Sequence, residues 1–223
     1  MTLRRYVAAA AVIGASMLGP SAARAAVVSF EFDTHFAGGS GPASTPWLTA
    51  TFDDGGTAGS VLLTLSTSGL SGNEFVSKWY FNVAPFQPIS FTHQSGQTPT
   101  AASSGEDASK AGGDGYFDIL ITYATSAANR FGAGLQSVLL LEAAGLTADM
   151  FDALSLDGGL AKNGFLAAAH VQGGLGGGSS WIRPGGDGEG PTPIPIMGAL
   201  PLLLSALGLL GFAGGWWRRR MSG

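Results

Sequence analysis

Residues Glu74 to Val83 alternate between large apolar and polar side chains, and this alternation constrains the fold more than any other feature of the chain. In an α-helix, neighbours on one face lie three or four residues apart, whereas a period of two places them on one face of a β-strand. The segment EFVSKWYFNV is therefore predicted to be a strand. It has Phe75, Trp79, Phe81 and Val83 on its buried face and Lys78, Tyr80 and Asn82 on the opposite face.

Several other segments repeat the pattern and are separated by turns rich in Gly, Asp, Asn and Ser. No strand–helix–strand alternation is present, which argues against a parallel sheet. We therefore predict an all-β fold, an antiparallel and jelly-roll-like β-sandwich over residues 26–182. In residues 115–125, Phe117, Ile119, Ile121 and Tyr123 are expected on the buried face. Further strands are expected within residues 27–32, 60–66, 137–143 and 164–173.

Three segments depart from this pattern. Residues 146–154 (LTADMFDAL) predict a short helix with Thr147 as its N-cap. Residues 96–115 are long and polar, which is typical of a mobile surface loop. Trp181 and Ile182 are expected to form a last edge strand, and the Gly- and Pro-rich residues 183–192 predict a flexible linker.

The first 25 residues predict a secretory signal peptide. Arg4 and Arg5 give a positive start, residues 6–18 are apolar, and Ala23-Arg24-Ala25 matches a cleavage site for signal peptidase. The mature chain is therefore expected to begin at Ala26. An uncleaved N-terminal membrane helix is the alternative interpretation, and the arginine pair also allows export by the twin-arginine route.

The exported part of the chain is acidic and lacks cysteine. Residues 26–190 hold fifteen Asp and Glu against five Lys and Arg, a net charge of −10. A nucleic-acid partner needs a basic stripe to neutralise phosphates, so this partner class is excluded. Without cysteine the domain has no disulfides, thiolate nucleophile or thiolate metal site, and its stability depends on its core.

The C-terminal region predicts a transmembrane helix. Residues 196–217 comprise 22 uncharged residues, which as a helix span ~33 Å, about one bilayer core. Trp216 and Trp217 suit a membrane interface. By the positive-inside rule, the arginines that follow lie in the cytoplasm, so the β domain is expected outside it. These topology-setting residues are Arg218, Arg219 and Arg220.

The order of features in this tail resembles the PEP-CTERM sorting signal of Gram-negative bacteria, in the variant with two prolines two residues apart. Pro193, Ile194 and Pro195 form the motif, and the apolar run and the arginine cluster follow it within residues 193–220. The usual form has Val before, Leu between and Ala after the prolines, where this chain has Thr192, Ile194 and Ile196. Parts of the β domain, such as SGLSGNEFVSKWYFNV and GDGYFDILITY, are similar to ectodomains carried by such proteins.

The resemblance implies a partner and a destination. Such tails are recognised and removed by a membrane sorting enzyme, an exosortase, and the proteins often accompany exopolysaccharide and biofilm production. Transient or permanent membrane anchoring is expected, followed by residence at the cell surface or in the extracellular matrix. Exopolysaccharide is then an expected partner of the β domain. The ectodomains of the family have no established activity.

The residues themselves predict no catalytic constellation, metal site or cofactor. His35, His93 and His170 occur in separate segments without the spacing of metal ligands. Carboxylates that were weighed as a glycosidase pair or as Ca²⁺ ligands have no matching pattern. The first set is Glu31, Glu74, Asp118 and Glu142, and the second is Asp53, Asp54, Asp107, Asp114 and Asp187.

We therefore expect a non-enzymatic structural or adhesive protein. The alternatives are a glycan-binding module and, in a different class, an envelope enzyme acting on glycans. For glycan binding, Tyr80 and Tyr116 are the candidate platform, because they are predicted on the strand faces opposite the core and an aromatic ring with a polar edge suits a sugar.

Overall fold

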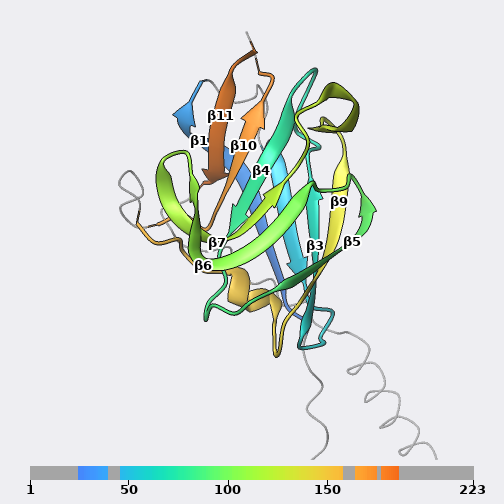
Figure 1. The fold of residues 1–223 in the computed structure, drawn as a ribbon, viewed down its shortest axis with the longest axis vertical. Helices are drawn as coiled ribbons and strands as arrows, with labels where there is room; N and C mark the ends of the chain where they lie inside the picture. The colour runs from blue at the N-terminus through green and yellow to red at the C-terminus, as the bar shows by residue number, and fades with distance from the viewer. Residues whose placement is uncertain (1–24, 40–45, 158–163, 175–176, 186–223) are drawn as a thin grey trace, which may run out of the picture.

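The computed structural model describes residues 25–39, 46–157, 164–174 and 177–185 (Figure 1). Strands make up 56% of the structure and helices 5%, so the predicted all-β antiparallel class is confirmed. The strands are β1 (Val27–Gly38), β2 (Leu48–Asp53), β3 (Ser60–Ser66), β4 (Phe75–Phe81), β5 (Ser90–Gly96), β6 (Ala101–Ala111), β7 (Asp114–Thr122), β8 (Phe131–Gly132), β9 (Gln136–Glu142), β10 (Ala167–Gln172) and β11 (Ser179–Pro184).

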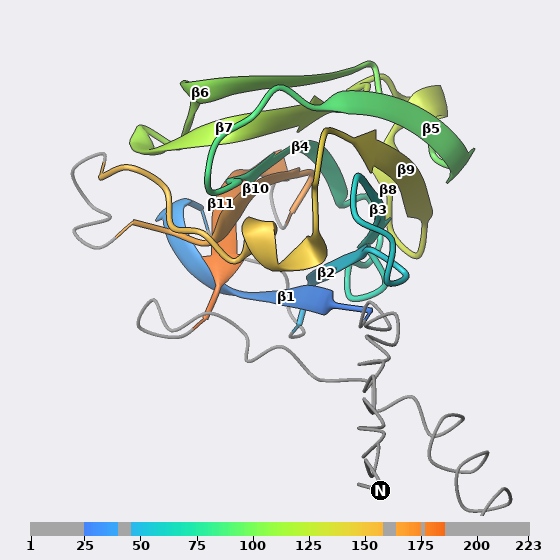
Figure 2. The same cartoon turned by 90° about the horizontal axis from the view of Figure 1, so that it is seen from below.

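All of these strands belong to one continuous sheet that bends round a single main core. Its order is β5-β9-β3-β2-β1-β11-β10-β4-β7-β6, and β8 pairs with β4 outside this path. Seen from below, β5, β6 and β7 form a layer opposite β1 and β2 (Figure 2). The two ends of the series meet where the Ile89 N–H, next to β5, donates to Ser104 Oγ of β6 at 2.9 Å. The sheet is therefore nearly closed.

The main core is built from the inward faces that the alternation predicts. Val28, Phe30 and Phe32 of β1 are buried while the residues between them are exposed. Phe52 lies at the centre of the aromatic cluster, stacked on Phe151 with their ring centroids 4.1 Å apart. Further inward residues are Val61, Leu63 and Leu65 of β3, Trp79 and Phe81 of β4, Ile119 and Ile121 of β7 and Leu139 and Leu141 of β9.

A β-bulge in β4 changes the predicted face of one residue. Val76 pairs with Val171 and Lys78 with His170, so Ser77 is the extra residue on this strand. The bulge brings Val76 into the main core in place of Phe75, which is buried outside that cluster. The prediction that Phe75 shares the core face with Trp79 is therefore wrong, because a strict period of two does not hold across a bulge.

A second apolar cluster covers the outer face of β10, β4 and β7. It contains Tyr80, Ala111, Phe117 and Ala168, with Phe36 and Trp181 among the partly buried residues packed on it. Phe117 was predicted in the main core. It lies in the second cluster, beyond the stretch of β7 that pairs with β4, which ends at Ile119. Opposite Asp118, β6 has extra residues between Ser104 and Ser109. The face of β4 that was expected to be open is therefore covered.

The polar residues 96–115 are not a loop, as was predicted, but contain all of strand β6 and the start of β7. This strand pairs with β7 at one end of the sheet series and is largely exposed, so polar side chains suit it. Asp107 has a positive φ of 48° at an irregular point of the strand, and its N–H donates to Asp118 Oδ1 at 2.9 Å.

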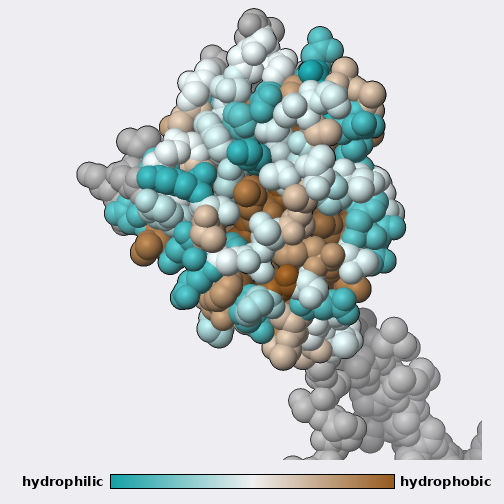
Figure 3. All heavy atoms as spheres, in the orientation of Figure 1, coloured by the Kyte–Doolittle hydropathy of each residue, from teal (hydrophilic) through white to brown (hydrophobic). Residues whose placement is uncertain are grey.

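In Figure 3, apolar residues gather near the middle of the face shown in Figure 1, among hydrophilic ones.

The predicted short helix is present as a 3-10 helix, η2 (Ala148–Phe151). Thr147 precedes it but its side chain forms no capping hydrogen bond. Asp54 from the turn after β2 accepts the Ala148 N–H instead, with an N–O distance of 3.2 Å. A second 3-10 helix, η1 (Ala127–Asn129), precedes β8.

Strand β11 also differs from its prediction. Trp181 and Ile182 belong to a strand, as expected, but it extends to Pro184 and lies inside the sheet between β1 and β10 rather than at an edge. Residues 183 and 184, assigned to the predicted linker, therefore belong to this strand, and residues 186–192 lie outside the described residues.

The two ends predicted to meet the membrane lie outside the described residues, apart from Ala25. These ends are the signal peptide and the tail from Pro193 to Arg220. Within the part of the chain that the structure describes, no helix has the length and apolar character needed to cross a membrane.

The two faces of β3 provide a direct test of the core assignment. Leu63 is fully buried, whereas the adjacent Leu62 is 41% exposed. Leu63→Ala is expected to lower the free energy of unfolding by about 2–5 kcal/mol, because it leaves a cavity. Leu62→Ala, the matched control, is expected to cost roughly 0.5 kcal/mol or less. Urea unfolding of both variants measures this, and equal losses would contradict the assigned register.

Candidate functional site

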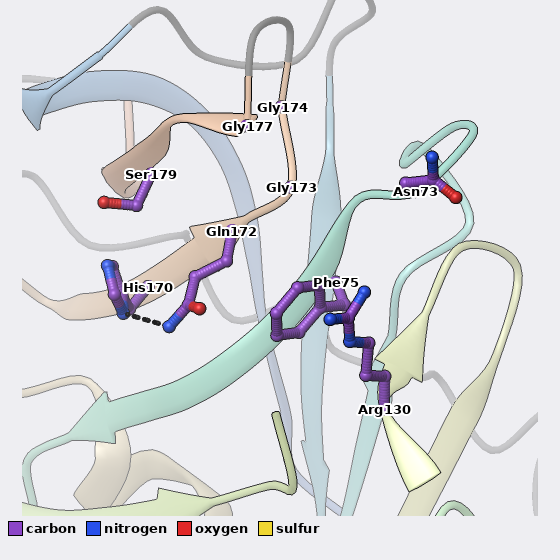
Figure 4. A pocket seen from close by; sticks show the side chains of 9 residues that line it. All are labelled: Asn73, Phe75, Arg130, His170, Gln172, Gly173, Gly174, Gly177 and Ser179. Atoms are coloured by element: carbon purple, nitrogen blue, oxygen red, sulfur yellow. Dashed lines mark hydrogen bonds between the residues drawn. The ribbon is translucent and has the colours of Figure 1, made fainter. Parts of the chain in front are cut away.

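An open depression with a mainly polar lining lies at one end of the sheet. It lies where β4 begins, β10 ends and β11 begins, and its volume is about 880 Å³ (Figure 4). Its lining residues are Asn73, Phe75, Arg130, His170, Gln172, Gly173, Gly174, Gly177 and Ser179.

His170 is held in place on β10 by a ring contact and two polar neighbours. Its imidazole stacks on the Trp181 indole, with 4.3 Å between ring centroids. Its Nδ1 lies 2.9 Å from Ser77 Oγ and 3.3 Å from Gln172 Nε2, and that amide nitrogen also donates to Ser77 Oγ. Since an amide nitrogen only donates, Nδ1 acts as an acceptor, and we assign the ring proton to Nε2.

The environment keeps His170 neutral. Partial burial lowers the pKa of His170 below its ordinary value, and the positive charge of Lys78 on the paired strand lowers it further. The imidazole therefore contributes a neutral hydrogen-bond donor and acceptor to the site, not a positive charge.

Arg130 supplies the cationic group of the depression. Its guanidinium lies over the Phe75 ring, 4.2 Å from the centroid, and its Nε donates to the Thr125 carbonyl at 2.8 Å. In Figure 4, Arg130 and Phe75 lie across the depression from His170 and Gln172. The Phe75 ring is thus covered on one side, and the stacked guanidinium is held in a fixed plane.

The arrangement suits binding better than nucleophilic catalysis. Ser77 and His170 are within hydrogen-bonding distance, as a nucleophile and its base are. However, Ser77 is only 3% exposed and sits in the sheet. Among the described contacts of His170, its side-chain hydrogen-bond partners are Ser77 and Gln172, and neither is a carboxylate that orients the ring. The side chains of His170, Gln172, Asn73, Arg130 and Ser179 line the depression and can form hydrogen bonds with hydroxyl or anionic groups of a ligand.

The structure does not bring the predicted aromatic pair together at the surface. Tyr80 is 2% exposed and packs against Phe117 and Trp181, with centroid distances of 5.6 and 5.8 Å, and burial raises its pKa to about 12. The prediction of an open Tyr80 ring is therefore wrong. Tyr116 is half-buried, and the Lys110 ammonium lies 4.8 Å from its ring centroid.

The carboxylates that were weighed as catalytic or calcium-binding groups are dispersed in the fold. Glu74 accepts the Ser71 N–H, and Asp118 accepts the N–H groups of Val83 and Asp107. Glu31 and Glu142 are exposed at separate strands. Asp187 lies outside the described residues. Across residues 25–185, apart from the gaps in the description, no three His, Cys, Asp or Glu side chains cluster as a metal site would require.

No pattern in the sequence indicates the depression, because its residues come from three distant segments. Gln172 and Arg130 carry no motif, and the approach of Ser77 to His170 depends on the bulge in β4. Comparison of the chain with family models, with curated proteins and with solved structures gives no match.

The lowered pKa of His170 predicts a pH effect on stability. Because the unfolded chain takes up a proton near pH 6.5 and the folded one at lower pH, this contribution is complete above pH 6.5 and is lost as the pH falls. When the pH is lowered from 7.5 to 5.5, the urea concentration at the midpoint of unfolding is expected to fall more for the wild type than for His170→Gln. His35→Gln, a change at an exposed histidine on β1, is expected to follow the wild type. A wild type and His170→Gln with the same pH dependence would disprove this.

Proposed function

We propose that this protein is exported and acts outside the cytoplasm as a non-enzymatic structural or adhesive component of the cell surface or exopolysaccharide matrix. In this proposal the N-terminal 25 residues are a cleaved signal peptide, and the β domain is a jelly-roll-like sandwich. The tail carries a transmembrane helix over residues 196–217 and is sorted by an exosortase-type enzyme.

The observation that carries this proposal is the order of features in the tail. A plain anchor needs an apolar helix and a positive flank, but this tail also has Pro193 and Pro195 directly before the helix. The prolines lack N–H donors, and Pro195 favours an extended Ile194. The chain is thus expected to stay unwound where it enters the bilayer, in the form that a protease can bind.

The placement of the two chain exits supports the same arrangement. Pro184, the last residue of β11, pairs with Phe32, whereas Ser180 pairs with Gly38 at the far end of β1. The chain therefore leaves the domain toward the end at which β1 begins. The N-terminal predicted segment is attached at this end and the chain after β11 leaves in its direction, while the depression at the start of β11 lies at the opposite end. An anchored domain would then present the depression away from the membrane.

Glycan binding is the second candidate function, and the depression favours it. Its donors and the Arg130 guanidinium, which the buried Phe75 ring holds flat, suit a sugar that carries hydroxyl and acidic groups. Since the domain has a net charge of −10 by sequence, Arg130 gives this end a local positive charge that an acidic glycan requires. In this form the proposal moves the binding site from Tyr80 and Tyr116 to the depression.

The sorting proposal predicts a defined effect of the two prolines. In a host with the sorting enzyme, Pro193→Ala with Pro195→Ala is expected to leave membrane insertion intact but to block release, so full-length protein accumulates in the membrane fraction. Pro201→Ala, a control inside the apolar run, is expected to be released like the wild type. Fractionation and blotting of a tagged protein measure this. If the wild type and the double variant remain at full length in the membrane fraction to the same extent, the tail is only a membrane anchor and the sorting proposal is wrong.

The glycan proposal predicts that binding depends on Arg130 rather than on Tyr116. Arg130→Met keeps an unbranched stem over Phe75 but removes the charge, and is expected to weaken binding of an acidic polysaccharide by about tenfold or more. Tyr116→Ala is expected to bind as the wild type does. Affinity measured with acidic and neutral polysaccharides tests this. If only Tyr116→Ala weakens binding, the glycan binds at Tyr116 and not in the depression. If the wild type binds no polysaccharide, the glycan-binding proposal is wrong and the structural role remains.

A further inference from the structure

Asp54 is a buried carboxylate at the end of the domain where the described chain begins. It is 6% exposed and lies in the turn after β2. Its Oδ1 accepts the N–H groups of Ala26 at 2.9 Å and Gly56 at 2.8 Å, and its Oδ2 accepts the N–H of Ala148. Asp54 thus joins the start of β1, its own turn and helix η2.

Among the described residues, the segments around Asp54 contain no Lys or Arg to balance its charge. Residues 46–77 and 131–157, which include β2, β3, β9 and η2, have no Lys or Arg in the sequence. On the described elements that pack against β2 and η2, the charged groups are acidic: Glu31 and Asp33 on β1, Asp53 on β2, and Asp149 and Asp152 in and after η2. Strand β1 also carries the titratable His35. Buried charges in proteins are as a rule paired with an opposite charge. Asp54 accepts hydrogen bonds from backbone N–H groups but has no described cationic partner.

The backbone nitrogen of Ala26 is the atom that can become that cation. Export with removal of the signal peptide would hydrolyse the Ala25–Ala26 peptide bond with water, leaving a carboxylate on Ala25 and an ammonium on Ala26. We propose that this new α-ammonium forms an ion pair with Asp54, so that processing of the chain completes its fold. The inference rests on the signal peptide of the proposed function.

The structure already has the geometry of this pair. The Ala26 N–H donates to Asp54 Oδ1 while the residue is still part of a peptide, and the Asp54 N–H donates to the Ala26 carbonyl at 3.3 Å. Cleavage replaces a neutral donor with a charged one at the same atom, and such hydrogen bonds are stronger. The unprocessed precursor therefore lacks part of the stability of the exported protein, which suits a chain that is translocated before it folds.

Two chains that differ by one residue test the pair. One covers residues 26–223 and the other 25–223, both purified in a nonionic detergent, with their first residues verified by intact mass. The extra Ala25 moves the ammonium by ~3.8 Å and leaves the neutral amide on Asp54. At pH 6.5 the chain that begins at Ala26 is expected to have an unfolding equilibrium constant about tenfold smaller, and a higher melting temperature.

The pH dependence identifies the group responsible. Pairing raises the folded pKa of the α-amino group above its unfolded value of about 7.7–8.0, so its stabilisation is present below that pH and is lost as the pH rises through the folded pKa. The difference between the two chains is therefore expected to vanish by pH 10. It should also vanish with Asp54→Asn and persist with Asp53→Asn, whose carboxylate accepts only the nearby Gly55 N–H among the described hydrogen bonds.

Equal melting of the two chains at pH 6.5, or a difference that persists at pH 10, would overturn the ion pair. The pH comparison uses unsubstituted chains, so it decides the question even if Asp54→Asn does not fold. The N-terminal residue of the protein exported by its own cell tests the export proposal separately. A start other than Ala26 there would refute the processing step, whatever the melting curves show.

Discussion

The structure depends on an aromatic core that one continuous antiparallel sheet encloses. Phe52 contacts the rings of Phe30, Phe81 and Phe151, which brings β1, β2, β4 and η2 to a common centre. The chain has no cysteine, so the fold depends on this burial and not on disulfides. The near closure of the series, with Ile89 and Ser104 joined at its ends, excludes water from the core and limits the exposed sheet edges.

Local irregularities in this sheet create its distinctive features. The bulge at Ser77 turns a regular strand into one that contributes Val76 to the core and brings Ser77 to His170. The register shift between β6 and β7 lets Asp118 accept backbone N–H groups from two segments. The polar depression therefore depends on the bulge in β4, whereas the second apolar cluster forms where residues of other strands cover the outer face of β4.

This explains what the sequence predicts and what it does not. The alternation in β1 and β3 correctly assigns Phe30 and Leu63 to the core, because one face of each strand meets solvent. It fails for Tyr80, whose face is covered by residues of β6, β7 and β11 that are distant in sequence. It also fails for β6, where polar composition reflects an exposed end strand rather than a loop. The depression combines Arg130 with His170 through tertiary packing, which no spacing in the sequence encodes.

In the proposed function, both ends of the chain are cleaved, and each cleavage affects the β domain. At one end, cleavage would supply the cation that Asp54 lacks, and at the other, cleavage would release the domain from the membrane. Intact-mass spectrometry of the protein recovered from the medium or surface of its own cells tests both steps at once. The account predicts a chain that begins at Ala26 and ends before the apolar run of residues 196–217. The mass of all 223 residues would contradict it.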